Sequence, residues 1–226
     1  TIILRDIQRG IWVRVHTDAG YIGLGETWYT PRGIAGIIHE LFAPILVGQN
    51  PLDIERHWKD MFHVANSMGS GGAEIRALSA LDIALWDIAG QVMEQPIYRV
   101  MGGPCRERIR IYNTCSVRGK DGGQVFKEPE KLAESFLKEG ISAIKVVLTD
   151  HLADEGHGYD FRAQDLAAAI APLAKMRSAV GHDLDIAHDG HGKFSLTNAI
   201  TVARAMEDYD LLWQEELLQP VNVETH

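Results

Sequence analysis

Two different patterns of hydrophobic and polar positions meet near residue 105. Before it, two β-rich runs at 11–17 and 21–26 flank a short glycine-containing connection, which predicts a hairpin. Apolar residues then recur every three or four positions in three stretches, and this spacing predicts helices at 32–46, 51–64 and 73–93. The first part of the chain therefore combines a small antiparallel sheet with helices, as an α+β domain does.

After residue 105 the pattern alternates between strand and helix. Strand patterns lie at 109–113, 142–147, 184–189 and 211–216, and helical patterns separate them at 129–139, 161–180 and 197–208. Such alternation is typical of βαβ units with a parallel sheet, either in a (β/α)₈ barrel or in a doubly wound fold. No glycine-rich phosphate-binding motif follows any of these strands, which disfavours a dinucleotide or P-loop site.

The number of strand patterns limits the fold. A complete eight-stranded barrel takes about 250 residues, whereas 106–226 contains only four strand patterns. Either the sequence is part of a longer polypeptide or the sheet is an open, four-stranded one, and we favour the first. The predicted fold class is α/β, with an α+β domain at 1–105 and the first half of a modified (β/α) TIM-type barrel at 106–226.

Composition narrows the classes of partner. The 226 residues include 22 basic and 31 acidic side chains, and a net charge of −9 disfavours a nucleic-acid binder. A hydrophobic share of 46% is typical of a globular protein with a sizeable core. Neither a long apolar run nor a targeting segment at the N-terminus is recognisable, so we expect no membrane partner and a cytoplasmic location.

Carboxylates stand where two of the predicted strands end. Asp189 ends the third strand and Glu215 ends the fourth, at the edge of a parallel sheet that carries the chemistry. Because side chains alternate along a strand, an inward Asp189 places His188 outward, whereas His191 has the same parity as Asp189. Two inward carboxylates on neighbouring strands repel unless a cation lies between them, and Mg²⁺ is the first choice.

Lys145 lies inside the apolar second strand, where a lysine is costly unless it is paired or functional. Carboxylates at the barrel mouth and an anionic substrate would supply its partners. Each residue also has an ordinary structural interpretation: Asp189 as a helix cap, His191 as a surface residue, and Lys145 as a lysine that reaches past apolar neighbours to water. Spacing alone leaves both interpretations open.

Several stretches of the sequence resemble the enolase superfamily, in the mandelate racemase/muconate lactonising enzyme branch with its acid-sugar dehydratases. Residues 13–26 resemble the hairpin of that family's capping domain, and residues 80–103 are similar to the helix and linker that join it to the barrel. The second, third and fourth barrel strands are matched by 143–145, 189–192 and 213–216. The resemblance implies a capping domain at 1–105.

The resemblance also implies roles for individual residues. Asp189 and Glu215 match the family's first two Mg²⁺ ligands, and Lys145 adds positive charge that binds the substrate carboxylate. Such enzymes remove the proton α to that carboxylate, and the metal stabilises the resulting enediolate. Trp28 and Tyr29 belong to the capping-domain loops expected to close over the substrate. The third metal ligand and a later catalytic histidine are expected beyond His226.

Two positions narrow the reaction that the resemblance implies. Val147 stands where racemase-like relatives carry a second lysine as the base. Asp189-Gly190-His191 is similar to the Asp-x-His of galactonate- and mannonate-type dehydratases, in which the histidine protonates the departing 3-hydroxyl. We therefore expect a lyase: an Mg²⁺-dependent dehydratase that converts a sugar acid to a 2-keto-3-deoxy sugar acid, with His191 as general acid. Leu217 departs from the family, which has proline there.

Two alternatives remain from the sequence. A racemase, epimerase or cycloisomerase on the same scaffold would exchange the α-proton with solvent without losing water. A non-catalytic scaffold or inactive fragment would keep the fold alone. The expected partners are a small-molecule carboxylate and further copies of the chain, because the family usually forms dimers or octamers.

Overall fold

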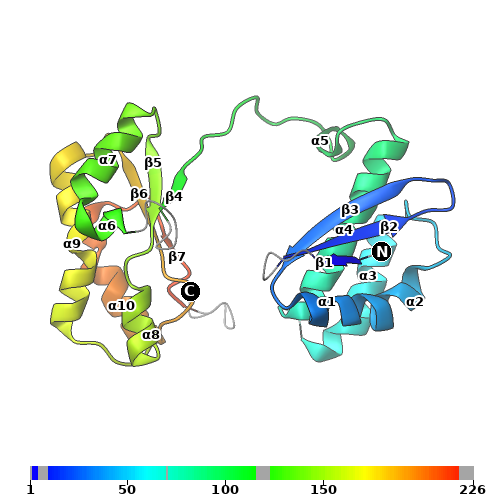
Figure 1. Ribbon diagram of the computed structural model, residues 1–226, viewed down its shortest axis with the longest axis horizontal. Coiled ribbons are helices and arrows are strands. Elements are labelled where there is room, and N and C mark those ends of the chain that lie inside the picture. The colour runs from blue at the N-terminus through cyan, green and yellow to red at the C-terminus, as the bar shows by residue number, and fades with distance from the viewer. Residues whose placement is uncertain (1, 5–9, 70, 116–122, 219–226) are drawn as a thin grey trace. The chain divides into compact units, whose positions relative to one another are not determined.

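The computed structural model describes residues 2–4, 10–69, 71–115 and 123–218 (Figure 1). Contacts divide the chain into two compact units, 1–107 and 108–226. Each unit has its own hydrophobic core, because the buried side chains form clusters that stay within one unit. Within the described ranges, no helix is long and apolar enough to cross a membrane.

The first unit packs helices on one face of a three-stranded antiparallel sheet. The sheet has the order β1 (Ile2–Leu4), β2 (Gly10–His16), β3 (Ile22–Trp28), and its alternating pattern buries Ile11 and Val13. The predicted hairpin is confirmed as β2 and β3. The helical elements are α1 (Pro31–Ile37), a π-helical turn η1 (Ile38–Phe42), α2 (Ala43–Leu46), α3 (Ile54–Ala65), the short η2 (Asn66–Met68), α4 (Ala73–Val92) and α5 (Ile97–Val100).

The closest packing in this unit joins α4 to β3, and glycine makes it possible. A Cβ atom at Gly25 would lie 1.8 Å from the Ala80 carbonyl oxygen, and one at Gly23 would lie 2.0 Å from the Ala84 carbonyl oxygen. The Leu24 backbone N–H also donates to Asp87 Oδ2 at 2.9 Å. Small residues on both sides therefore let the helix backbone lie directly on the strand backbone.

We predict that Gly25→Ala lowers the free energy of unfolding of the first unit by roughly 3 kcal/mol or more, because helix α4 must move away from β3. Gly36→Ala is the control, since a Cβ at Gly36 in α1 meets no atom within 4 Å. That substitution should be neutral or stabilise by up to about 1 kcal/mol, because alanine favours helices. Urea unfolding measures both variants, and equal effects would contradict the close contact.

Helix α4 begins at a buried acidic residue. Glu74 is 8% exposed, and its Oε1 accepts a hydrogen bond from the Gly72 backbone N–H at 2.8 Å. Hydrogen bonds from its own backbone N–H, and from those of Gly72 and Gly71, lower the pKa of Glu74 although burial acts in the opposite direction. The carboxylate thus satisfies backbone donors that the first turn of a helix leaves unpaired.

A lowered carboxyl pKa stabilises the folded state above the unfolded-state pKa of about 4.3, and this contribution is lost as the pH falls through the folded-state pKa. We therefore predict that Glu74→Gln costs about 1 kcal/mol at pH 7, and that the difference from wild type shrinks toward zero below about pH 4. Glu107→Gln changes the net charge equally at an exposed position and is the control. Thermal unfolding across pH 3–7 checks this; a pH-independent difference would refute it.

The second unit contains a four-stranded parallel sheet in the order β4-β5-β6-β7. Figure 1 shows helices α7 and α9 covering one face of this sheet. Buried side chains from both layers, including Ile144, Leu173, Met176 and Ile186, form the core there. The elements are β4 (Asn113–Cys115), α6 (Gln124–Lys127), α7 (Pro129–Lys138), β5 (Ala143–Val146), α8 (Asp150–Gly156), α9 (Ala163–Val180), β6 (Asp185–Asp189), α10 (Leu196–Ala205), η3 (Glu207–Tyr209) and β7 (Gln214–Glu215).

The strand predictions differ in accuracy. Those for 142–147 and 184–189 are confirmed by β5 and β6, and that for 211–216 shortens to Gln214–Glu215. The prediction for 109–113 is wrong, because β4 begins only at Asn113. Asn113 pairs with Ile144, the second residue of β5, and residues 109–112 lie outside the strand. Helix α8 carries no clear periodicity and was not predicted.

Register decides which side chains share a face of the sheet. Lys145 pairs with Ala187, and Asp189 pairs with Glu215. Because Ala187 and Asp189 are two residues apart on β6, the side chains of Lys145, Asp189 and Glu215 all lie on one face. Ile144, Val146 and Ile186 have the opposite parity and pack in the core under the helices. The charged residues therefore gather on the face that α7 and α9 do not cover.

Candidate active site

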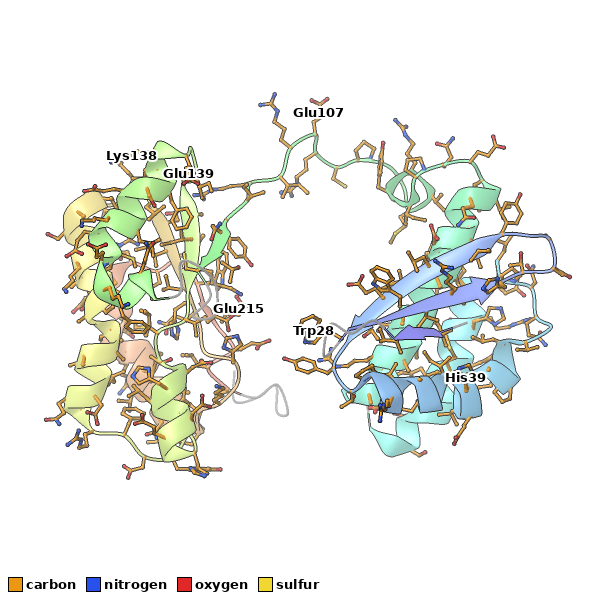
Figure 2. The ribbon with its side chains drawn as sticks, in the orientation of Figure 1. Trp28, His39, Glu107, Lys138, Glu139 and Glu215 are labelled. Carbon is orange, nitrogen blue, oxygen red and sulfur yellow. The ribbon has the colours of Figure 1, made fainter. Side chains whose placement is uncertain are left out.

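Three charged side chains from neighbouring strands meet on the face of the sheet opposite to α7 and α9. The Nζ atom of Lys145 lies 2.7 Å from Asp189 Oδ2 and 3.0 Å from both Glu215 Oε1 and Oε2. Lys145 and Asp189 are 8% and 6% exposed, and Glu215 is half-buried. Figure 2 shows Glu215 on this face. The two carboxylates therefore share one ammonium group.

This arrangement sets the electrostatics of the group. Burial would lower the pKa of Lys145, but its hydrogen bonds to Asp189 and Glu215 raise the pKa above the ordinary value. Burial would raise the pKa of Asp189, but hydrogen bonds from Lys145 and from the His191 backbone N–H lower it. Trp213 Nε1 also donates to Glu215 Oε2 at 3.0 Å. Lys145 and Asp189 thus each favour the charged form of the other.

His191 lies in the loop directly after β6. Its φ of 51° is left-handed, and the backbone N–H donates to Asp189 Oδ1 at 3.2 Å. The ring Nε2 lies 3.8 Å from Asp189 Oδ2, and the ring Nδ1 lies 3.0 Å from Asp150 Oδ2. The loop is fixed by two backbone hydrogen bonds, from Gly190 N–H to Glu215 O and from Gly192 N–H to Glu216 O. His191 therefore lies next to the carboxylate pair.

Sequence reasoning missed two residues beside His191. Asp150 is the first residue of α8, and Lys193 Nζ lies 3.0 Å from the same Asp150 Oδ2 that contacts His191. The signal that could have found Asp150 is its position shortly after the end of β5, at the edge of the sheet that carries Asp189 and Glu215. Lys193 follows His191 by two residues and carries no signal of its own.

His188 lies on the opposite face of β6 from Asp189, as the alternation predicts. It is fully buried, and burial lowers the pKa of His188 to about 4. Its Nε2 lies 3.1 Å from Thr149 Oγ1, which follows β5. A neutral imidazole therefore joins the ends of β5 and β6 on the helix side.

Trp28 and Tyr29 belong to the first unit, at the end of β3 (Figure 2). Both are close to half exposed, and their rings meet edge to face with centroids 5.8 Å apart. The Arg76 guanidinium lies 5.0 Å from the centre of the Tyr29 ring. Tyr29 and Thr30 both have positive φ, of 65° and 37°, so this turn holds a conformation uncommon for such residues. Lys145, Asp189, His191 and Glu215 all belong to the second unit.

The oxygens of Asp189 and Glu215 are the kind of ligand that a hard divalent cation prefers. They converge on one cationic group, which shows that the pair can surround a positive charge. In the described part of the chain, no group of three or more His, Cys, Asp or Glu side chains forms a complete metal site. The residues present fit Mg²⁺ in chemistry, and Asp189 and Glu215 would supply two of its ligands.

Comparisons with known proteins assign the family. Residues 3–102 match the N-terminal domain of mandelate racemase/muconate lactonizing enzyme, and residues 128–226 match the enolase C-terminal domain-like family. The crystal structure of an enolase of the mandelate racemase subgroup from Agrobacterium tumefaciens has a TM-score of 0.88 at 34% identity, and it covers 99% of this chain and 57% of its own. The chain belongs to the enolase superfamily, in its mandelate racemase branch, and the expected fold is confirmed.

Curated relatives include enzymes with two kinds of reaction. D-xylonate dehydratase of Haloferax volcanii is 34% identical over 220 residues, which are 94% of this chain and 51% of the relative. D-galactarolactone cycloisomerase of Agrobacterium fabrum is 28% identical over 221 residues, which are 98% of this chain and 54% of the relative. The chain thus spans about half the length of these relatives.

We predict that Lys145→Met lowers the free energy of unfolding of the second unit by about 3 kcal/mol in the presence of EDTA, because it leaves Asp189 and Glu215 without their shared cation. Lys175→Met, at an exposed position on α9, should change stability by less than about 0.5 kcal/mol. Urea unfolding of both variants measures the difference. Equal stability of Lys145→Met and wild type would show that the ion pairs contribute nothing.

Proposed function

We propose that the protein carrying this chain is an Mg²⁺-dependent dehydratase that converts a sugar acid to a 2-keto-3-deoxy sugar acid. The observation that carries the proposal is the position of His191, whose Nε2 lies 3.8 Å from Asp189 in a site that also holds Lys145 and Glu215. An imidazole suited to donate a proton, a cation and two carboxylates suited to bind a metal thereby lie together. The relative named D-xylonate dehydratase supports the same reaction class.

In this proposal the chain's own residues handle the substrate carboxylate and the leaving group. Lys145 donates hydrogen bonds to the carboxylate of the sugar acid. After loss of the α-proton, the electron pair of the former C2–H bond forms the C2=C3 bond as the C3–O bond breaks. His191 gives the proton on Nε2 to the departing oxygen, which leaves as water because hydroxide is a poor leaving group. The enol product then becomes the 2-keto acid.

Asp189 and Glu215 would hold the metal. When bound, Mg²⁺ supplies fixed positive charge for the negative charge that develops on the substrate carboxylate. Trp28 and Tyr29 in the first unit are proposed to contact the sugar, since a loop over the substrate excludes water and sets which acid fits. Half-exposed aromatic rings are suited to that contact because their apolar faces pack on the C–H side of a sugar.

The test is a screen of the protein, expressed from its full reading frame, with Mg²⁺ and a library of aldonic and aldaric acids. We expect 2-keto-3-deoxy products, detected as semicarbazones, with at least one acid and none after EDTA treatment. His191→Asn should lower the rate of dehydration at least about 100-fold, the contribution of a general acid, and should keep Mn²⁺ binding. His182→Asn, at the exposed loop before β6, should leave the rate unchanged within about twofold.

A second candidate is a racemase, epimerase or cycloisomerase, which the relative named D-galactarolactone cycloisomerase favours. The two functions separate when the reaction runs in D₂O with NMR detection. Exchange of the α-proton without loss of water in wild type would support this second candidate and reject the dehydratase. Metal binding with neither exchange nor product would support a non-catalytic protein.

A further inference from the structure

The two nitrogens of the His191 ring face two different carboxylates. Nδ1 lies 3.0 Å from Asp150 Oδ2 on α8, whereas Nε2 lies 3.8 Å from Asp189 Oδ2 at the end of β6. The ring therefore has one nitrogen at hydrogen-bonding distance from α8 and the other turned toward the site that holds Lys145. Rotating the ring by half a turn about the Cβ–Cγ bond would put Cδ2 in the place of Nδ1 and break the shorter contact.

Asp150 is itself held in place from a second direction. Lys193 Nζ lies 3.0 Å from Asp150 Oδ2 and 2.8 Å from Asp154 Oδ1, one turn further along α8. The Asp150 side chain is 23% exposed, and its other oxygen, Oδ1, is buried without a hydrogen-bond partner among the described residues. Only Oδ2 makes contacts, and they converge on it from His191 and Lys193. The carboxylate is thus fixed against rotation.

The backbone conformation of His191 also favours the contact between its ring and Asp150. Its left-handed conformation costs about 1–3 kcal/mol for a residue other than glycine. A Cβ at Gly190 would lie 3.0 Å from Leu217 Cδ2, so Leu217 packs closely against the residue before His191. The loop therefore presents the His191 side chain in one direction, and that direction brings Nδ1 to Asp150.

We propose that Asp150 is a positioning residue that accepts the Nδ1 proton of His191 and so directs Nε2 at the substrate. The inference rests on the proposed function, because it concerns the proton donor for the leaving hydroxyl. A histidine whose Nδ1–H is held by a carboxylate carries its transferable proton on Nε2, the nitrogen next to Asp189. Asp150 touches no reacting atom and acts only through the His191 ring.

The experiment compares Asp150→Asn with Asp154→Asn in the protein expressed from its full reading frame, loaded with Mg²⁺. Both substitutions remove one carboxylate charge from α8 and one contact of Lys193, but only Asp150 contacts His191. Asp150→Asn should lower kcat for dehydration roughly 10- to 100-fold, as loss of a partner behind a catalytic histidine does. Its KM should stay within about twofold, and Asp154→Asn should keep both constants within about twofold.

The rate at which the α-proton exchanges with D₂O distinguishes a misplaced acid from a general loss of structure. Asp150→Asn should retain exchange of the α-proton with D₂O at close to the wild-type rate, since the acid acts only when the C3–O bond breaks. A sugar acid with fluorine at C3 should recover most of the lost rate, because fluoride leaves with less help from an acid. Equal losses in Asp150→Asn and Asp154→Asn, or parallel losses of exchange and dehydration, would overturn the proposal.

An NMR measurement tests the role of Asp150 independently of the proposed enzyme activity. If wild type dehydrates no sugar acid, the proposed function fails, while ¹H–¹⁵N spectra of the His191 ring still report which nitrogen carries the proton. We expect a proton on Nδ1, hydrogen-bonded to Asp150, in wild type and Asp154→Asn, and loss of that hydrogen bond in Asp150→Asn. A wild-type ring without a proton on Nδ1 would overturn the role of Asp150 whatever the activity.

Discussion

The second unit depends on one ammonium group between two carboxylates. Asp189 and Glu215 are paired neighbours on adjacent parallel strands, and both are removed from bulk water to different degrees. Two such charges about 4 Å apart repel by about 4 kcal/mol at the effective dielectric constant typical near protein surfaces. Lys145, from the next strand along the sheet, turns this repulsion into attraction. Without a cation at this point, the pairing of β6 with β7 would hold two repelling carboxylates on one face.

The same pairing of β6 with β7 also places His191. Backbone hydrogen bonds continue beyond the ends of the two strands, from Gly190, Gly192 and Phe194 to the carbonyls of residues 215–217. The loop after β6 is therefore an extension of the sheet rather than a free connection, which explains how a non-glycine residue keeps a left-handed backbone there. Leu217 packs against Gly190 in this extension.

Much of this site follows from local rules. Alternation along a strand predicts Asp189 and His188 on opposite faces. Repulsion between Asp189 and Glu215 predicts a cation beside them, and Lys145 lies there. Asp150 could not be predicted in the same way, because its contact with His191 joins α8 to a distant loop and no local periodicity marks it. The sequence also misplaces the start of β4, because the strand pattern at 109–113 does not show where pairing with β5 begins.

Under the proposed function, Lys145 must pair with Asp189 and Glu215 and also bind the substrate carboxylate. An ammonium group has three N–H donors, and its contacts with Asp189 and Glu215 already engage three carboxylate oxygens. A substrate carboxylate must therefore compete with Asp189 and Glu215 for the same donors. A second cation bound to Asp189 and Glu215 would leave more of the Lys145 donors to the substrate carboxylate. Binding of that cation therefore favours binding of the acid substrate. By linkage, the substrate favours binding of the cation to the same extent.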